Sequence, residues 1–336
     1  MERKVKIAVD AMGGDNAPGE IVKGAVDATN ENQDVSVFLT GRTETIQNVL
    51  RDLTYDEERV KIVEAPEIIE TGEPPVLAIR QKRESSLVKA MYLVKEGKCD
   101  AFVSAGSTGA ILVGGQVVIG RIKGIQRAPL APLIPTETGF SLLVDCGANV
   151  DARAPQLVQF AQIGSIYMEE VMHVKNPRVA LVNIGAEEEK GNQLVRETFP
   201  LLKNCPDINF VGNIEARDIP AGAADVIVCE AFVGNVILKM YEGVAKSLMH
   251  VIKKGMMSSL KSKIGALLVK PALKASLDDY DMNKHGGAPM LGLNGLAVKA
   301  HGSSNAQTFK NACLQCVDFY QADMGNLIRN RIGGEM

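Results

Sequence analysis

Small and polar residues follow short apolar runs at six places in this chain. Glycines at such positions let backbone N–H groups approach a ligand closely, and N–H groups at a helix N-terminus attract anions. One such segment is ordinary turn chemistry, but six that meet at one sheet edge predict a site for an anionic, phosphorylated ligand. The six segments are residues 10–15, 104–110, 145–149, 184–192, 212–218 and 230–235.

Several familiar catalytic motifs are missing from the sequence. It contains neither the G-x-G-x-x-G dinucleotide fingerprint, nor a phosphate-binding G-x-x-x-x-G-K-[ST] loop, nor the H-E-x-x-H zinc motif. Ser107 does not stand in a G-x-S-x-G elbow, so we interpret it as a helix cap or anion donor rather than a nucleophile. Cys313 and Cys316 lie on an apolar helical stripe, which favours core packing over metal binding. We expect no metal and no cofactor.

Two further residues have side chains suited to a phosphate or an oxyanion. His301 lies just before the last predicted helix, among hydroxyl side chains, where an imidazole can donate to a phosphate. An ordinary hydrogen-bonded loop histidine is the alternative. Lys190 follows three consecutive glutamates, and its plainer interpretation is a solvated lysine beside carboxylates that complement a helix N-terminus.

The elements that must position these residues alternate along the chain. Short runs rich in β-branched residues are each followed by a segment with helical periodicity. This alternation indicates an α/β fold with a mostly parallel sheet covered on both faces. Ligands bind such folds outside the carboxyl ends of the strands. No linker marks a boundary, so we expect one interlocked domain over residues 1–336. The predicted strands are residues 5–10, 35–41, 100–104, 141–145, 178–183, 208–212 and 224–229.

Composition excludes other classes of protein. The 336 residues carry 37 basic and 40 acidic side chains, so no global basic excess exists to bind nucleic acid. The six cysteines are dispersed, which argues against a disulfide framework. Residues 101–120 carry no charge but contain five glycines, so we expect a buried strand, a turn and a core helix rather than a membrane span. The N-terminus lacks signal-peptide features, and we expect a cytoplasmic protein.

A Lys-rich stretch occupies residues 238–277, which we expect to form a protruding pair of amphipathic helices broken at Gly255. Residues 243–277 contain seven lysines and neither Asp nor Glu. Such a pattern is typical of a surface for anionic lipid or an acidic protein, or of a solvated face over a helix in the core or a dimer interface. The residues we expect to make the membrane or carrier-protein contact are Met256, Met257, Leu260, Lys261, Ile264, Leu267 and Leu268.

Taken together, the motifs of this chain resemble the PlsX family of bacterial phosphate acyltransferases. The resemblance runs from residue 4 to about residue 330. One departure is His285, where the family usually has an aromatic residue before Gly-Gly-Ala. The matching segments are residues 9–18, 104–110, 120–125, 145–151, 190–192, 212–218, 232–236 and 298–304.

The resemblance implies a three-layer α/β/α fold like that of isocitrate and isopropylmalate dehydrogenases, and a homodimer. It implies conversion of long-chain acyl-acyl carrier protein (acyl-ACP) and inorganic phosphate into acyl phosphate and free ACP. The product would supply a membrane glycerol-3-phosphate acyltransferase in phospholipid synthesis, with a possible peripheral contact of this protein on the inner face of the cell membrane. Rival readings are a phosphotransacetylase-like enzyme using acyl-coenzyme A, a dehydrogenase of similar fold, and a non-enzymatic lipid- or phosphate-binding scaffold.

Within the matching motifs, charge and position suggest individual roles. Lys190 and Asn235 would hold phosphate and stabilise the tetrahedral intermediate, and His301 is the third catalytic candidate. A thiolate leaves readily, so a strong general acid is less necessary. The candidate substrate- and phosphate-binding residues are Asp10, Gly13, Gly14, Asp15, Ser104, Gly106, Ser107, Thr108, Asp145, Asn149, Asn192 and Asn213.

Overall fold

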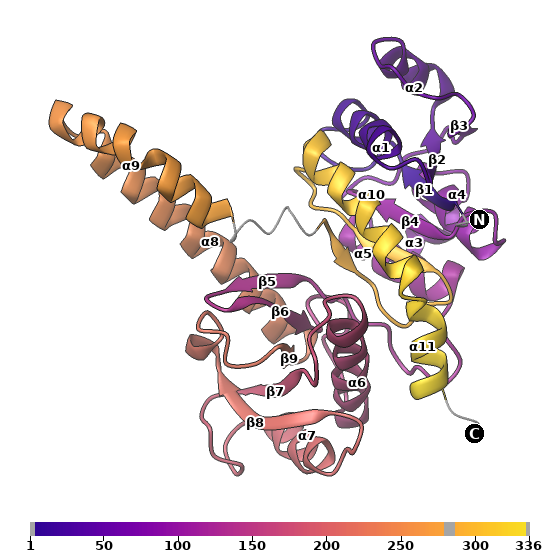
Figure 1. Ribbon diagram of the computed structural model, residues 1–336. Helices are drawn as coiled ribbons and strands as arrows, with labels where there is room; N and C mark the ends of the chain where they lie inside the picture. The colour runs from indigo at the N-terminus through magenta and orange to yellow at the C-terminus, as the bar shows by residue number, and fades with distance from the viewer. Residues whose placement is uncertain (1–3, 279–285, 334–336) are drawn as a thin grey trace.

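The computed structural model describes residues 4–278 and 286–333, with alternating strands and helices through most of its length (Figure 1). His285 lies outside the described residues. The first half contains β1 (Val5–Asp10), α1 (Gly19–Glu31), β2 (Val35–Gly41), α2 (Thr43–Leu50), β3 (Val60–Glu64), α3 (Pro75–Gln81), α4 (Ser86–Lys95), β4 (Ala101–Ser104), α5 (Thr108–Gly114), a π-helical turn (Gly115–Ile119), β5 (Leu133–Thr136), β6 (Gly139–Val144) and α6 (Ala154–Glu170).

The second half contains the longest helices. Its elements are β7 (Arg178–Asn183), α7 (Gln193–Lys203), β8 (Asn209–Glu215), a 3₁₀ turn (Ala216–Asp218), β9 (Val226–Val228), α8 (Ala231–Met256), α9 (Leu260–Asp278), β10 (Ala288–Pro289), β11 (Leu296–Lys299), α10 (Ala306–Gln321) and α11 (Met324–Arg331).

The described strands form two sheets, and each has a point where the strand order reverses. The first has the order β10-β11-β4-β1-β2-β3, parallel except for β10. From β1 the chain runs to β2 and β3, then returns to place β4 on the other side of β1. Loops after β1 and β4 therefore diverge at a topological switch point, where α/β folds hold their ligands.

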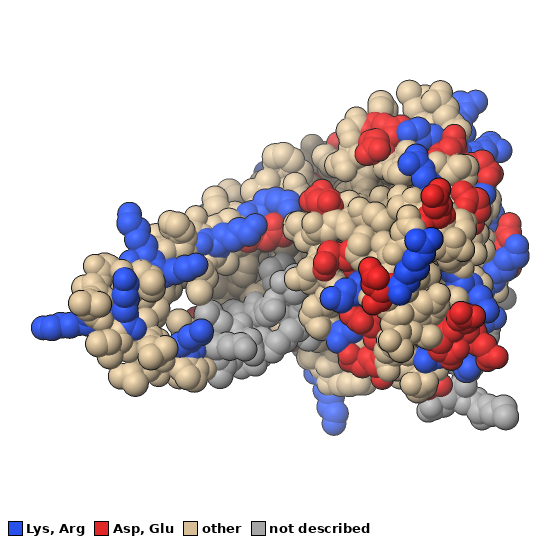
Figure 2. All heavy atoms as spheres, turned by 90° about the horizontal axis from the view of Figure 1, so that it is seen from above, with Lys and Arg blue, Asp and Glu red and all other residues tan. Residues whose placement is uncertain are grey.

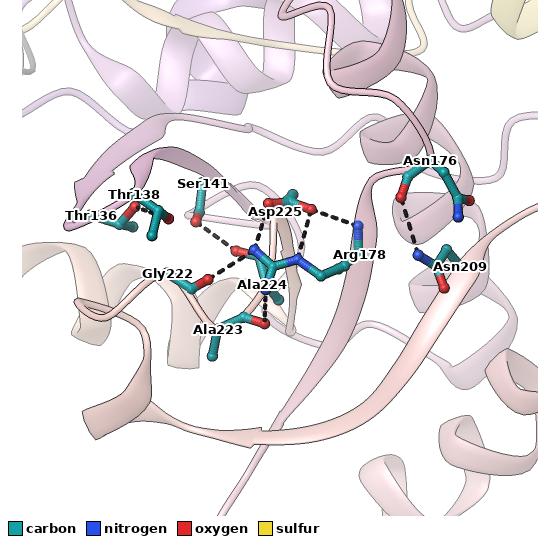
Figure 3. A network of polar contacts seen from close by, with 10 residues as sticks. All are labelled: Thr136, Thr138, Ser141, Asn176, Arg178, Asn209, Gly222, Ala223, Ala224 and Asp225. Carbon is teal, nitrogen blue, oxygen red and sulfur yellow. Dashed lines mark hydrogen bonds and ion pairs between the residues drawn. The ribbon is translucent and has the colours of Figure 1, made fainter.

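The second sheet has the order β5-β6-β9-β7-β8, with only β5 antiparallel. Arg178, at the start of β7, fastens this sheet to the loop before β9 (Figure 3). Its guanidinium donates to Asp225 Oδ1 at 2.9 Å and to the carbonyls of Gly222 and Ala223 at 2.9 and 3.0 Å. This network lies at the amino ends of the strands, so it stabilises the sheet from the edge opposite the candidate loops.

The α/β class and the mostly parallel strands are as predicted, but the single large sheet is divided in two. Proline explains the division, because it cannot donate a ladder hydrogen bond and is confined to sheet edges. The antiparallel edge strands β5 and β10 contain Pro135 and Pro289. The sheets instead meet through an isolated bridge between Leu130 and Met290 and a bond from the Ala131 N–H to the Pro289 carbonyl at 2.9 Å.

Helices cover both faces of the first sheet. Alternate residues of β1 point to opposite sides: Ile7 and Val9 join a core cluster with Phe309 of α10, whereas Ala8 joins a second cluster with Met91 of α4. The first cluster continues into the second sheet through Phe160 of α6, so one apolar core spans both sheets. Cys313 and Cys316 are fully buried in it, which confirms that they pack in the core.

Helices α8 and α9 pack against each other and project from the body of the molecule (Figure 1). The predicted break at Gly255 is wrong by two residues: α8 runs to Met256, because glycine only weakens a helix, and the turn over residues 257–259 makes the break. Residues 101–120 form β4, α5 and the π-helical turn, as expected. None of the helices in the described part of the chain combines the length and apolarity needed to cross a membrane.

Candidate active site

A buried carboxylate organises the glycine-rich loops at the carboxyl ends of β1 and β4. Ser104 Oγ donates to Asp10 Oδ2 at 2.6 Å, and the Gly106 N–H donates to Ser104 Oγ at 2.9 Å. A Cβ on Gly13 would lie 2.3 Å from Asp10 Oδ2, so only glycine fits there. Burial raises the pKa of the Asp10 carboxyl, and the Ser104 hydrogen bond opposes this. Asp10 and Ser104 therefore fix the loops from beneath.

The opposite loop comes from the end of β11. The Asp15 N–H donates to the Gly302 carbonyl at 2.8 Å. In the loop after β1, a Cβ on Gly14, whose φ is +111°, would lie 2.9 Å from the Ala105 Cβ, so this second position of that loop also requires glycine. Ser107 Oγ accepts from the Ala110 N–H at 3.4 Å as the N-cap of α5, which matches the capping interpretation.

A cavity of about 490 Å³ opens where these loops face α8. Its walls combine the end of β11, the start of α5, the loop after β6 and one face of α8. The apolar residues Leu130, Pro132 and Leu133 form one side. A cavity with an apolar wall and several convergent polar groups is typical of a ligand site. The polar residues that line it are Thr108, Cys146, Asn235, Lys239, Glu242, Lys246, Lys299, His301 and Ser303.

The N-terminus of α8 is held close to the end of β6. Glu230 caps the helix, because its carboxylate accepts from the N–H groups of Phe232 at 2.6 Å and Val233 at 3.0 Å. A Cβ on Gly234 would lie 2.0 Å from the Asp145 carbonyl oxygen, so the helix approaches the strand as closely as only glycine allows. This approach brings the next residue, Asn235, to the cavity wall with an exposed side chain.

His301 enters the cavity as a neutral ring. Its Nδ1 accepts from the Ser303 N–H at 3.2 Å, and because that group can only donate, the proton lies on Nε2. Burial is the largest cause that lowers the pKa of His301. The positive charges of Lys299, Lys239 and Lys246 also lower it, whereas the Glu242 carboxylate raises it. Nε2 is therefore an N–H donor at neutral pH.

Asp145 and Asn149 lie beneath the cavity rather than in its wall. Asp145 Oδ1 accepts from the Leu130 N–H at 2.9 Å, and its Oδ2 accepts from the Asn149 side-chain amide at 2.7 Å. Both side chains are buried, and Asn149 also donates to the Ala128 carbonyl at 3.2 Å. With these bonds made inside the protein, the pair supports the cavity wall from behind.

Lys190, Asn192 and Asn213 lie apart from the cavity, at the carboxyl ends of β7 and β8. Lys190 Nζ pairs with Glu187 Oε1 at 2.6 Å, and its side chain is 48% exposed. Asn213 donates to the Glu187 carbonyl at 3.0 Å, and Asn192 caps α7 by accepting from the Val195 N–H at 2.9 Å. Among the catalytic candidates, the structure brings together Asn235 and His301 but not Lys190.

Sequence reasoning missed four charged residues of the cavity: Lys239, Glu242, Lys246 and Lys299. The first three follow Asn235 at helical spacing, so the signal was present once α8 was known to begin at residue 231. Lys299 lies two residues before His301, in a segment from which only the histidine was predicted to contact the substrate. Within residues 4–278 and 286–333, no three His, Cys, Asp or Glu side chains gather as metal ligands would.

Comparison with known proteins identifies the family of this chain. Residues 5–326 match the model of a family described as "Fatty acid synthesis protein". The chain is 47% identical to a phosphate acyltransferase of Clostridium novyi, covering 99% of this chain and 100% of the relative. It is 50% identical to a phosphate acyltransferase of Clostridium beijerinckii, covering 98% and 100%.

Solved structures share the fold at low sequence identity. A phosphotransacetylase from Streptococcus pyogenes aligns with a TM-score of 0.61 and 18% identity, covering 95% of this chain and 94% of that one. A 4-hydroxythreonine-4-phosphate dehydrogenase from Klebsiella pneumoniae aligns with a TM-score of 0.51 and 13% identity, covering 94% and 98%. With near-complete coverage at almost half identity, this chain belongs to the fatty acid synthesis protein family, and its relatives there are phosphate acyltransferases.

Proposed function

We propose that this phosphate acyltransferase takes its acyl group from long-chain acyl-ACP and releases acyl phosphate for glycerol-3-phosphate acylation in phospholipid synthesis. The observation that carries the proposal is a row of lysines that leads from the cavity along α8. Lys239 and Lys246 line the cavity, and Lys253 follows at the same interval of seven residues. Seven residues are close to two helical turns, so the three lie on one face over about 21 Å.

The charge of the projecting hairpin favours an acidic partner. Lysines are the only charged side chains seen on its outer part in Figure 2, in agreement with the absence of Asp and Glu from residues 243–277. The rest of that view shows both signs of charge intermixed. Acyl carrier proteins are strongly acidic, and a basic track would guide one to the cavity.

The transfer itself needs alignment and oxyanion stabilisation. A phosphate oxygen attacks the thioester carbonyl carbon, the new C–O bond forms, and the C–S bond breaks with its electron pair leaving on sulfur as the thiolate. The Nε2–H of His301 and the side-chain amide of Asn235 supply neutral donors for the tetrahedral oxyanion. Lys190 remains a third candidate, and its role would require release from Glu187.

Two further proposals concern assembly. Leu260, Ile264, Leu267 and Leu268 are 63–80% exposed on α9, and we propose that they contact an anionic membrane together with the hairpin lysines. A separate exposed stripe on α8 would bury its apolar surface in a homodimer. The stripe consists of Phe232, Val236, Met240, Val244, Leu248 and Val251.

Donor choice tests the proposed function. Purified enzyme is incubated with acyl-ACP or acyl-coenzyme A, with and without inorganic phosphate, and both thiol release and hydroxylamine-trapped acyl phosphate are measured. We expect phosphate-dependent turnover of acyl-ACP in preference to acyl-coenzyme A. Preference for acyl-coenzyme A would replace the proposal with a phosphotransacetylase-like activity, and silence with both donors would favour a scaffold.

A charge reversal examines the lysine row directly. Lys253→Glu should raise the KM for acyl-ACP about fivefold and leave the KM for phosphate unchanged, because the residue lies on the hairpin beyond the cavity. The control is Lys98→Glu, which reverses an exposed lysine paired with Glu96 in the loop between α4 and β4. Equal effects of the two variants would remove the row from carrier binding.

A further inference from the structure

Lys299 is a cation on the wall of the cavity. It ends β11, where it pairs in register with Ser104 of β4, and its side chain is partly buried. Nζ donates to the carbonyl of the next residue, Ala300. No carboxylate of the described residues forms an ion pair with it, whereas Lys239 in the same cavity pairs with Glu242 at 3.0 Å.

Charged groups from three sides face Lys299. Lys239 approaches from α8, Asp10 and Asp15 lie on β1 and its loop, and His301 follows on its own loop. The pKa of Lys299 is lowered to about 8, mainly by burial and also by the positive charge of Lys239, although the two aspartates oppose the shift. A partly buried ammonium that forms no ion pair gains stability when an anion binds beside it.

Neighbouring donors match a tetrahedral oxyanion. Thr108, His301 and Ser303 line the same cavity, and His301 presents a neutral N–H there. The N-terminus of α8 is not available to an anion, because the Glu230 carboxylate already occupies its N–H groups. The ammonium groups of the cavity are therefore the strongest centres of positive charge within it.

We propose that Lys299 is a catalytic residue that binds the attacking inorganic phosphate directly through its ammonium group. The inference rests on the proposed function in one respect, namely that the reaction takes place in this cavity. By this proposal, phosphate binds at the end of β11, whereas the acyl donor binds along the lysine row of α8.

The test compares Lys299→Met and Lys299→Arg with the wild-type enzyme. Lys299→Met should raise the KM for phosphate about 10- to 100-fold, the range expected for a lost charge-assisted hydrogen bond, with little change in the KM for the thioester. Lys175→Met, at an exposed loop lysine after α6, is the control and should match the wild type. An unchanged KM for phosphate in folded Lys299→Met would overturn the inference.

The pH profile gives a readout that a structural role would not move. The protonated fraction of Lys299 falls as pH rises through about 8, so the wild-type KM for phosphate should climb above that pH. Arginine stays protonated, so Lys299→Arg should keep a flat profile to higher pH. Coinciding profiles for wild type and Lys299→Arg would also overturn the inference.

Calorimetric titration of inorganic phosphate into the enzyme without a donor separates this inference from the donor proposal. Binding by the wild type that is lost in Lys299→Met supports the inference whichever thioester is used. Equal binding by both proteins contradicts it. The kinetic measurements use whichever thioester turns over, so a failure of acyl-ACP as donor would appear only in the donor comparison.

Discussion

At the scale of single residues, the site consists of groups that act on a ligand and groups that hold them in place. Asn235 and His301 line the cavity, whereas Asp145 and Asn149 make their hydrogen bonds to groups inside the protein. Buried polar groups need such partners, and side chains that interact with a substrate must leave some capacity free. The distinction predicts different consequences for substitutions in the two groups.

Asn235→Ala should lower kcat about 10²- to 10³-fold without unfolding the protein, because it removes a donor to the developing oxyanion. Steady-state kinetics and circular dichroism measure the two effects. The matched control is Asn209→Ala on β8, whose amide donates to the Asn176 carbonyl at 3.1 Å, away from the cavity (Figure 3). Lys190→Ala belongs in the same assay, since a nearly wild-type rate would remove Lys190 from the reaction.

At the scale of elements, α8 joins the chemistry to the surface. Its first turn touches β6 through Gly234, its cavity face carries Asn235 and three charged residues, and its far end belongs to the hairpin. A change at the first turn therefore displaces the functional groups further along the helix.

Two glycines of α8 allow a matched comparison. Gly234→Ala should destabilise the protein by about 1–3 kcal/mol, because its Cβ would meet the Asp145 carbonyl oxygen at 2.0 Å. A Cβ on Gly243 meets nothing within 4 Å, so Gly243→Ala should stabilise by about 0.5–1 kcal/mol through helix propensity. Urea unfolding measures both, and equal effects would contradict the close approach.

The hairpin tip can be tested separately from the cavity. Leu260→Asp combined with Ile264→Asp should abolish co-sedimentation with vesicles containing phosphatidylglycerol, because it places carboxylates where 80% and 63% exposed side chains would enter the interface. Val76→Asp with Leu77→Asp on α3 is the control, at 65% and 50% exposure. Unchanged vesicle binding by the tip variant would contradict the membrane contact and would favour a role of the hairpin in packing.

At the scale of the whole molecule, the exposed stripe of α8 predicts assembly. Light scattering should give a mass of twice the 36.0 kDa of one chain. Met240→Asp, in the middle of the stripe at 65% exposure, should shift the protein toward monomer. Val150→Asp, at 57% exposure in a loop, should leave the mass unchanged. A wild-type monomer at micromolar concentration would contradict the homodimer.

The local pattern by itself determined the α/β alternation, because the hydrophobic periodicity of a strand or a helix depends on residues that are close in the sequence. It identified the strands Val5–Asp10 and Arg178–Asn183 to the residue, and it identified the loops that end them. It also separated the core cysteines from metal ligands. It missed β3, β5, β10 and β11. Strands β5 and β10 pair with the next strand along the chain, but they have only four and two residues, which is too short for a periodic pattern.

Only the tertiary structure decided which loops meet. The family motifs predicted that Lys190 and Asn235 act in one site. In the fold, Lys190 lies in an ion pair beyond the end of β7, whereas Asn235 lines the cavity. Lys239 and Lys299 are 60 positions apart, and they come together because α8 and the end of β11 line the same cavity. Such contacts arise from the strand order and the close approach at Gly234, which no local periodicity encodes.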